Sequence, residues 1–267
     1  MFTHHPAGVR VPVGVAAPPT AAATIGLAKL RPAKVRSALR RRRFEFVLER
    51  TPVRKDVPTL ALGSSYGGWV IPDVVQPDWV CYCVGAGGDV SFDLDLIRRY
   101  GVEVRGFDPV SSYVESARRE AGEERRFSIH EVAIATKDGP IRMQVTHDEG
   151  SRSVSAAHLY DTEKFIELPG RSLDSLMSEL GDTRVDLLKL DIEGAEYELL
   201  AQVDLRRLGV KVFATQLHHT GTVREARSLI GRLRDSGYVA VARRSSVKLT
   251  FLAEELLPAA QASSTAS

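Results

Sequence analysis

The sequence predicts an α/β fold: a doubly wound, mostly parallel sheet that ends in a C-terminal antiparallel hairpin. Three observations predict it. Short apolar runs typical of buried strands alternate with stretches of helical period, which favours parallel strands covered by helices on both faces. The first such strand, Val80–Val84, leads directly into a glycine turn and a helix. The last two apolar runs, Tyr238–Ala242 and Val247–Leu252, leave no room for a helix between them and must pair antiparallel.

Ahead of the sheet, the turn-rich segment Pro52–Pro77 carries the sequence GSSYGGW at Gly63–Trp69 and predicts a hairpin or loop. The first half of the sheet follows it. The glycine turn after the first strand leads into a helix at Asp89–Tyr100, whose apolar residues recur on one face. The other elements predicted in this half are a strand at Glu103–Phe107, a helix at Ser111–Ala121, and strands at Phe127–Ala135 and Pro140–Thr146.

The next segment, His147–Pro169, has little periodicity, and we expect an irregular insert that covers a functional site. Ser172 then predicts the N-cap of a helix that ends at Gly181. The remaining elements expected are a strand at Val185–Leu190, a helix at Gly194–Val203, a strand at Lys211–Leu217 and a helix at Thr222–Ser236.

We expect the 267 residues to comprise a disordered leader at 1–28, a basic helical arm at 29–55, the α/β domain at 56–255 and a frayed tail at 256–267. No run of about 18 apolar residues could span a bilayer. The only cysteines, Cys81 and Cys83, lie two apart in an apolar strand, a spacing that suits neither a disulfide nor a zinc site. We therefore predict buried free thiols and a cytoplasmic location.

The net charge of +2 conceals an uneven distribution. Lys29–Lys55 holds eleven basic and two acidic residues, so the rest of the chain has a net charge of −7. A body of that sign is poorly suited to nucleic acid, and we expect no nucleic-acid partner. The arm has two interpretations: peripheral contact with an anionic membrane, or a solvated helix packed on the domain. The packing residues under the second interpretation would be Val35, Leu39, Phe46 and Val47.

The turn after the first strand reads Gly85-Ala86-Gly87-Gly88-Asp89, and glycines there let a ligand approach the backbone closely. Asp108 ends the second strand, at the spacing of about 20 residues where a carboxylate can accept both hydroxyls of a ribose. A dinucleotide site would need a third glycine where Val90 stands, and Asp89 would repel a phosphate. Asp89 suits the positively charged methionine end of S-adenosylmethionine instead.

The segment Leu187–Leu200, LLKLDIEGAEYELL, is more specific. It resembles the hallmark K-[LIM]-D-[IV]-E-G-[AS]-E of the FkbM-type methyltransferases, and the resemblance extends from about Gly67 to Tyr238. It also includes Phe107-Asp108-Pro109, Val132-Ala133, Arg171-Ser172-Leu173-Asp174 and His218-His219. The resemblance implies a Rossmann-like class I fold and S-adenosylmethionine-dependent O-methylation of a sugar, glycolipid or secondary-metabolite hydroxyl.

From the turn, the strand ends and the resemblance together, we expect a set of cofactor-binding residues. They are Gly85, Ala86, Gly87, Asp89, Phe107, Asp108, Val132 and Asp191. One position departs from the pattern, because many methyltransferases carry an acid two residues before the first glycine, where this chain has Cys83. Asp89 is the candidate substitute for that acid. Tyr66 and Trp69 either wall the cofactor pocket or are ordinary packing aromatics.

Methyl transfer to an alcohol calls for a base, and the candidates are the polar residues at neighbouring strand ends. We hypothesise that His218 or His219 is the general base and that Asp191 orients it or the substrate. Glu193 completes the catalytic candidates. The plainer alternative is that Glu193 caps the following helix and a histidine bonds nearby backbone.

A second version of the mechanism places a divalent metal between Asp191, Glu193 and a histidine. Helix capping already accounts for the carboxylates, so we expect no metal. Lys189 lies in mid-strand and is predicted to be buried with a carboxylate partner, Asp191 or Glu193.

Two other functions compete with the methyltransferase. One is a nicotinamide-dependent oxidoreductase, which Val90 and Asp89 argue against. The other is a non-catalytic binding module of the same fold that is tethered by its basic arm. The acceptor, a small molecule or glycan, should be selected by the insert His147–Pro169.

Overall fold

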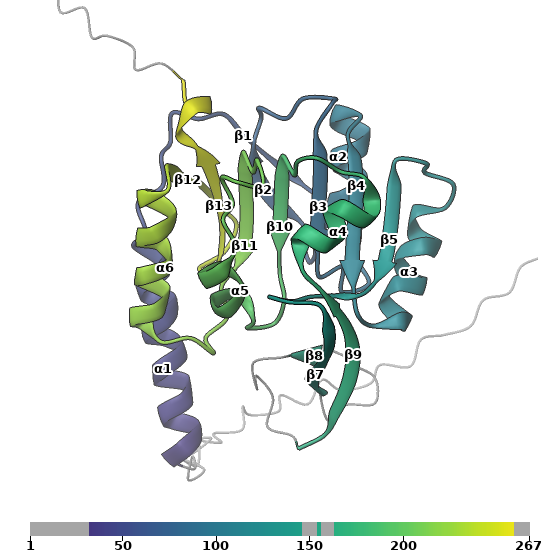
Figure 1. Cartoon of the computed structure of the whole chain (residues 1–267). Coiled ribbons are helices and arrows are strands. Elements are labelled where there is room, and N and C mark those ends of the chain that lie inside the picture. The colour runs from purple at the N-terminus through teal and green to yellow at the C-terminus, as the bar shows by residue number, and fades with distance from the viewer. Residues whose placement is uncertain (1–31, 146–153, 156–162, 259–267) are drawn as a thin grey trace, which may run out of the picture.

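The computed structural model describes residues 32–145, 154–155 and 163–258. A seven-stranded sheet with the order β12-β13-β11-β10-β3-β4-β5 forms its centre (Figure 1). Its strands are β3 (Val80–Val84), β4 (Glu103–Asp108), β5 (Phe127–Glu131), β10 (Leu187–Leu190), β11 (Val212–Gln216), β12 (Tyr238–Arg243) and β13 (Lys248–Ala253). The five strands from β11 to β5 pair in parallel, whereas β13 is antiparallel to both β11 and β12. The predicted doubly wound fold with a C-terminal antiparallel hairpin is confirmed.

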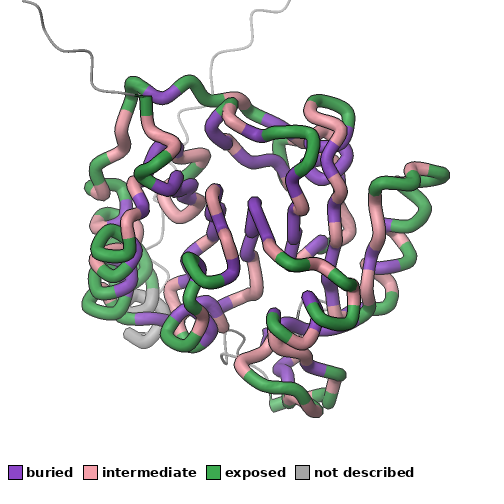
Figure 2. Tube along the Cα trace, turned by 45° about the horizontal axis from the view of Figure 1, so that its top comes forward, coloured by how far each residue is buried: buried purple, intermediate pink, exposed green. Residues whose placement is uncertain are grey.

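Helices cover both faces of this sheet (Figure 1). They are α1 (Pro32–Glu49), α2 (Ser91–Tyr100), α3 (Ser111–Ala121), α4 (Leu173–Leu180), α5 (Glu196–Gln202) and α6 (Val223–Asp235), with a 3-10 turn η1 at Glu254–Leu256. On one face, apolar residues of α1, α4, α5 and α6 pack with Tyr82, Leu188 and Phe213. On the other face, α2 packs with Cys81 and Cys83, which are free and buried as predicted. The buried residues gather along the central strands (Figure 2).

The helix ends follow local sequence signals. The Ser172 side chain caps α4 by accepting a hydrogen bond from Ser175 N, and Gly181 ends that helix in the left-handed conformation. Thr222 and Glu225 form a reciprocal capping box at the start of α6. These signals place the ends of both helices, so the connections to the neighbouring strands are short.

A hairpin of β1 (Thr59–Leu62) and β2 (Trp69–Pro72) precedes the main sheet, within the segment where a hairpin or loop is predicted. Trp69 and Ile71 are buried with α2 on the second face of the sheet. Hydrogen bonds from Gly63 N to Asp95 (2.6 Å) and from Ser64 N to Ser91 Oγ (2.8 Å) tie the hairpin loop to α2. The loop is thereby held beside the glycine turn.

A second, four-stranded sheet with the order β6-β9-β7-β8 lies beyond the end of the main sheet. It comprises β6 (Ala133–Ile134), β7 (Gly139–Val145), β8 (Val154–Ser155) and β9 (Phe165–Arg171). Two expectations fail here. The strand predicted at Phe127–Ala135 divides into β5 and β6, which belong to different sheets. The segment His147–Pro169 is not irregular throughout, because Phe165–Pro169 lies in β9; pairing with β7 stabilises this largely exposed strand, which has little apolar alternation. Residues 146–153 and 156–162 of the insert lie outside the described residues.

Helix α1 lies within the segment that we expect to form the basic arm, and its packing differs from the expectation. Phe44 and Leu48 are buried in the main core, whereas Leu39 and Phe46 have 53% and 50% of their surface exposed. The helix is rotated so that a different pair of apolar residues faces the domain. Val35, like the predicted leader at 1–28 and the tail after residue 258, falls outside the part described in side-chain detail.

None of the described helices is long and apolar enough to cross a membrane.

Candidate active site

A cavity of about 310 Å³ opens at the carboxyl ends of β3, β4 and β10. The glycine turn after β3 forms one wall, and only glycine fits its backbone conformation and close contacts at position 85. This glycine has a φ of 79°, and a Cβ there would lie 1.9 Å from the backbone oxygen of Asp191. The turn after β3 and the end of β10 therefore touch through backbone alone, which brings Asp191 into the same cavity as the glycines.

Asp108 lies at the end of β4 with 4% of its surface exposed. Its Oδ2 accepts a hydrogen bond from Gly87 N (3.0 Å) and its Oδ1 accepts one from Val110 N (2.9 Å). Burial raises the pKa of this carboxyl, and the two backbone donors only partly oppose the rise. The carboxylate that is predicted to bind a ribose is thus fixed in orientation at the cavity wall.

Asp89, at the far end of the glycine turn, also lines the cavity. Ser64 Oγ donates to one carboxylate oxygen (2.6 Å), and Ser91 N (3.0 Å) and Ser91 Oγ (2.5 Å) donate to the other. Burial raises the pKa of Asp89, but these hydrogen bonds more than offset it and the pKa is lowered. A Cβ on Gly67 would lie 2.6 Å from the Asp89 carboxyl carbon, so the backbone of the hairpin loop packs directly against this side chain.

The two aromatic residues of the hairpin loop have different surroundings. Tyr66 lines the cavity and is 79% exposed, whereas Trp69 is buried in the second-face core. Two of the expected cofactor residues also lie in the core. Phe107 is fully buried against Tyr82, and Val132 is buried next to Ala133 and Ile134, which themselves line the cavity.

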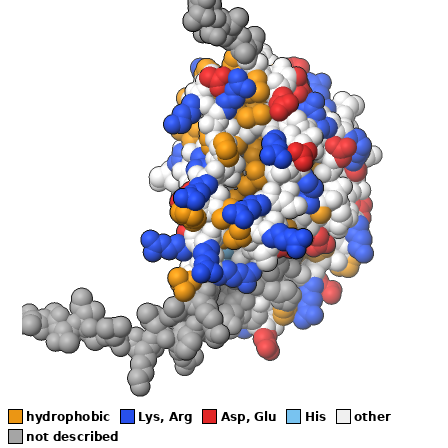
Figure 3. All heavy atoms as spheres, turned by 90° about the vertical axis from the view of Figure 1, so that its left-hand side faces the viewer, with side chains coloured by type: hydrophobic (Ala, Val, Ile, Leu, Met, Phe, Trp, Pro, Cys, Tyr) orange, Lys and Arg blue, Asp and Glu red, His pale blue; other side chains and the backbone are white. Residues whose placement is uncertain are grey.

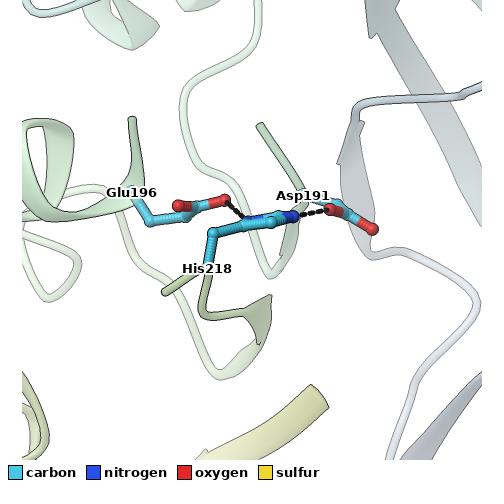
Figure 4. A group of neighbouring side chains, drawn as sticks. All are labelled: Asp191, Glu196 and His218. Carbon is cyan, nitrogen blue, oxygen red and sulfur yellow. Dashed lines mark hydrogen bonds and ion pairs between the residues drawn. The ribbon is translucent and has the colours of Figure 1, made fainter. Parts of the chain in front are cut away.

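The opposite wall of the cavity carries Asp191 and Glu193, which follow β10. His218 follows the neighbouring strand β11, and its Nε2 lies 3.8 Å from Asp191 Oδ1 and 3.4 Å from Glu193 Oε2. Its Nδ1 lies 2.8 Å from Glu196 Oε1. The imidazole ring is therefore held between Glu196 on one side and Asp191 on the other (Figure 4).

Burial by itself lowers the pKa of His218, but the hydrogen bond and charge of Glu196, with the charges of Asp191 and Glu193, raise it to about 9. The ring is then doubly protonated at neutral pH and donates from both nitrogens. Gln216 Nε2 is placed 2.9 Å from His218 Nε2. Beside a protonated ring, that amide would be turned to present its oxygen as acceptor.

Sequence reasoning gave Glu196 no role, although it lies in the EGAE part of the motif. The residue is fully buried, and Oε1 accepts hydrogen bonds from Ile192 N (3.1 Å) and His218. Within the described residues, Oε2 is buried without a hydrogen-bond partner. The signal was present in the sequence, because Glu196 shares the apolar face of α5 with Leu199 and Leu200, where an acid requires a partner.

Glu193 does not cap the following helix. The N-cap of α5 is Ala195, and no side chain caps that end. Glu193 instead has a φ of 51°, the left-handed region that costs a non-glycine residue about 1–3 kcal/mol. Its backbone oxygen accepts a hydrogen bond from Ser155 Oγ in β8 (2.5 Å). The second sheet thus contacts the strained turn that presents the Glu193 carboxylate to the cavity.

The two adjacent histidines occupy different environments. Neither lines the cavity itself, but His218 contacts the carboxylates that do, whereas His219 is half-buried on the side of α1. Burial lowers the pKa of His219, and the charges of Arg41, His218 and Arg40 lower it further, which places it beside α1. The structure therefore brings His218, and not His219, to the carboxylates of the cavity.

Two lysines complete the charged wall. Lys189 Nζ donates to the backbone oxygen of Gly85, where a carboxylate partner is predicted. The charge of Lys189 acts on the carboxyl of Asp93 in α2. Burial raises the pKa of Asp93 to about 6, although the charge of Lys189 lowers it. Lys248 of β13, which sequence reasoning missed, lies with its Nζ 4.0 Å from Asp191 Oδ2 and 4.7 Å from the Trp69 ring centre. Burial lowers the pKa of Lys248.

Asp191, Glu196 and His218 each offer one ligand atom within 4.8 Å of the others, which is a spacing suited to a metal ion. The 2.8 Å contact between Glu196 and His218 Nδ1 leaves no space for an ion between those two groups. A cation would have to bind on the Nε2 side, between His218, Asp191 and Glu193, with Glu196 orienting the ring from behind. These three residues are the ones that the metal-dependent version of the mechanism names.

Comparisons with known proteins agree with this description. The sequence profile of the family described as "Methyltransferase FkbM domain" matches residues 73–240, which is more than half of the chain. No curated protein matches the sequence.

Among solved structures, the chain is distantly similar to three proteins with methyltransferase or RNA-processing names. The fibrillarin pre-rRNA processing protein of Methanococcus jannaschii is 11% identical, with a TM-score of 0.40 and coverage of 67% of this chain and 68% of that one. The precorrin-6y C5,15-methyltransferase of Geobacter metallireducens is 15% identical, with a TM-score of 0.37 and coverage of 67% and 83%. The human methyltransferase 10 domain containing protein is 10% identical, with a TM-score of 0.39 and coverage of 81% and 82%.

Proposed function

This chain belongs to the FkbM methyltransferase family, and from that premise we propose that it transfers a methyl group from S-adenosylmethionine to a hydroxyl oxygen of a small molecule or glycan. The observation that carries the proposal is the composition of the cavity. One wall consists of the glycine turn with Asp108, and the other carries Asp191 and Glu193, with the buried His218 beside them as a group that can exchange a proton.

The first wall fits the adenosine and methionine parts of the cofactor. Asp108 already accepts from Gly87 N, and each of its oxygens retains a lone pair for a ribose hydroxyl. A Cβ at Gly87 would meet nothing within 4 Å, so the turn leaves open space beside the acid. Asp89 supplies negative charge at the far end of the same turn. When bound, S-adenosylmethionine would supply the electrophilic methyl group.

The second wall fits activation of the acceptor. We propose that His218, in the fraction of molecules whose Nε2 is unprotonated, takes the proton of the acceptor hydroxyl while the hydroxyl oxygen bonds to the methyl carbon and the sulfur–carbon bond of the donor would break. Glu196 holds Nδ1–H and keeps the ring oriented, which is the function of the carboxylate in other acid–histidine pairs. Asp191 and Glu193 position the hydroxyl. Because the pKa of His218 is about 9, turnover limited by this step should rise with pH up to that value.

Calorimetric titration tests the cofactor assignment. S-adenosylhomocysteine and NAD are titrated separately into the whole chain and into an Asp108→Asn variant. We expect the unaltered chain to bind S-adenosylhomocysteine and not NAD. In the Asp108→Asn variant the affinity for S-adenosylhomocysteine should fall about 10- to 100-fold, because the charged hydrogen-bond acceptor is lost. The Asp78→Asn variant is the control, since that acid is exposed and far from the cavity. Tight NAD binding, or an unchanged affinity in Asp108→Asn, would contradict the proposal.

A pH profile tests the role of His218. Release of S-adenosylhomocysteine is measured against a panel of sugars, glycolipids and polyketide alcohols, and the best acceptor is followed from pH 6 to 10. A rate that climbs through this range supports a histidine base. A rate that is constant at lower pH and falls near pH 9 would assign the role of base to a carboxylate. The protonated ring of His218 would then be a positioning group.

A further inference from the structure

A broad face formed by α1, α6, and strands β12 and β13 lies at the side of the molecule (Figure 3). It contains a groove of about 660 Å³, which we call the α1–α6 groove. Apolar side chains form much of the groove, among them Phe46, Val47, Pro52, Ile230 and Val239. No step of the proposed reaction uses this groove.

Two large apolar side chains extend the groove along α1. Leu39 and Phe46 are 53% and 50% exposed, and they lie seven residues apart, which places them on one face of the helix. Four large hydrophobic residues of the described chain are exposed, and these two share one helix. The same helix buries Phe44 and Leu48 in the core, so α1 is anchored to the domain while it presents a second apolar stripe outward.

Arginines surround this apolar surface. Arg42 and Arg43 are exposed between Leu39 and Phe46, and the Arg50 guanidinium lies 4.0 Å from the centre of the Phe46 ring. Arg227 and Arg234 line the groove from α6. Figure 3 shows basic side chains on both sides of an apolar strip.

The acids of this face are fewer and partly engaged. Glu45 pairs with Arg41 at 2.8 Å, and Asp235 pairs with Arg234 at 3.1 Å. Glu225 is held by the capping box of α6. Glu49 and Glu254 are the other acids near the groove. The face therefore keeps an excess of positive charge around an apolar floor.

We propose that the α1–α6 face docks on the surface of an anionic lipid bilayer. Leu39 and Phe46 would enter the boundary between headgroups and acyl chains, and the arginines would contact lipid phosphates. Binding at a membrane interface depends on the apolar area that is buried and on attraction between basic groups and anionic lipids, and this face offers both. A nucleic acid would need the basic groups without the apolar floor.

The location of this face relates it to the cavity. Arg40 Nη2 donates to the backbone oxygen of Thr220 (3.3 Å), two residues after His218. The basic part of α1 thus adjoins the loop that carries the histidine. A protein docked on this face would hold its cavity close to the bilayer surface, where a hydroxyl on a lipid headgroup is within reach.

Vesicle sedimentation tests the proposal without cofactor or acceptor, so its result is independent of the proposed methyl transfer. The whole chain is mixed with vesicles of phosphatidylcholine alone or with a third phosphatidylglycerol. We expect binding to the anionic vesicles, weakened in high salt, and none to phosphatidylcholine. Arg42→Glu/Arg43→Glu should weaken binding about 25-fold or more, and Phe46→Ser about tenfold.

Matched variants on other surfaces serve as controls. Arg118→Glu/Arg119→Glu reverses two exposed charges on α3, and Ile166→Ser removes the exposed apolar residue of β9. Neither should change vesicle binding by more than about twofold. Circular dichroism and thermal unfolding verify that each variant is folded.

Three results with vesicles would overturn the proposal, and one result with a peptide would do the same. The vesicle results are equal binding to neutral vesicles, equal loss in the α3 control, and loss of vesicle binding when soluble glycerol phosphate or an RNA homopolymer competes at micromolar concentration. The last would assign the face to a soluble phosphate or to nucleic acid. Binding of an acidic amphipathic peptide with no binding to any vesicle would assign it to a protein partner.

Discussion

The two walls of the cavity are built in different ways. The wall formed by Gly85–Gly88 and Asp108 consists of backbone and of an acid whose oxygens accept from Gly87 N and Val110 N. The wall formed by Asp191 and Glu193, with His218 beside them, consists of side chains. Glu193 has a strained backbone conformation, and one buried oxygen of Glu196 has no hydrogen-bond partner among the described residues. The first wall is complete as it stands. The second keeps charged groups close together.

This difference suggests a division of labour. A wall whose hydrogen bonds are internal can bind one unchanging molecule, the methyl donor, at little reorganisation cost. A wall with a histidine whose pKa is about 9 and three nearby carboxylates can gain or lose a proton during a reaction. Variants that alter one wall and leave the other intact can separate the two functions.

Gly85→Ala should be the most damaging change to the first wall. Its Cβ would collide with the Asp191 backbone oxygen and would need a φ of 79°, so we expect a loss of about 2–4 kcal/mol of unfolding free energy. The same collision would distort the cavity, so affinity for S-adenosylhomocysteine should fall more than about 100-fold. At 1.4 kcal/mol for each factor of ten, this is a loss of more than about 2.8 kcal/mol of binding free energy. Urea unfolding and calorimetry measure the two effects.

Gly87→Ala is the matched control, because a Cβ there meets nothing within 4 Å although φ is 56°. It should cost about 1 kcal/mol. Equal damage from both variants would show that backbone conformation, rather than contact between the walls, makes Gly85 necessary.

His218→Ala should affect only the second wall. We expect turnover to fall about 10²- to 10⁴-fold with the affinity for S-adenosylhomocysteine changed by less than about threefold. His219→Ala, which alters the neighbour that faces α1, should retain turnover within about threefold. Equal losses in the two variants would contradict the assignment of His218 as the base.

The raised pKa of His218 also predicts how stability depends on pH. Its folded pKa of about 9 exceeds the ordinary value of 6.5, so its stabilising effect is complete below pH 6.5 and is lost as pH rises through 9. The loss should be of the order of 2–3 kcal/mol. Urea unfolding at pH 6, 7.5 and 9.5 measures it, and Glu196→Gln should remove most of this dependence while lowering the pKa of His218 in NMR titration.

Gly67→Ala should have the smallest effect of the set. Its Cβ would press on the Asp89 carboxylate and displace the hairpin loop, which is bonded to that acid by the hydrogen bond from Ser64 Oγ. We expect the affinity for S-adenosylhomocysteine to fall about 3- to 10-fold, equivalent to loss of about one hydrogen bond. Gly231→Ala in α6 has space for a Cβ and should leave affinity unchanged.

How much of this the sequence predicts depends on the range of each interaction. The strand order around the glycine turn and the pairing of Gly87 with Asp108 follow from a local βα repeat, and both are visible as spacing. The position of Lys248 beside Asp191 depends on β13 pairing with β11, and no local pattern specifies that register. The separation of His218 from His219 depends on which side of one strand end faces the core.

Small geometric differences account for the remaining errors. Helix α1 contains apolar residues at several positions, and a modest rotation selects Phe44 and Leu48 over Leu39 and Phe46 as the buried pair. Similarly, β9 contains a proline and lacks a regular alternation of apolar and polar residues, so its strand conformation depends on β7. In both cases the deciding partner is distant in sequence, and a pattern read within a short window cannot include it.

The position of β13 between β11 and β12 has a consequence for synthesis of the protein. This strand follows β12 in the sequence and is the last strand of the described residues, and it carries Lys248 to the cavity. A nascent chain can therefore form the glycine turn early. The place between β11 and β12 stays unfilled until β13, which ends at Ala253, has left the ribosome. Until β13 is in place the edge of β11 is open to pairing with another chain, so exposure to aggregation lasts until this strand has been inserted.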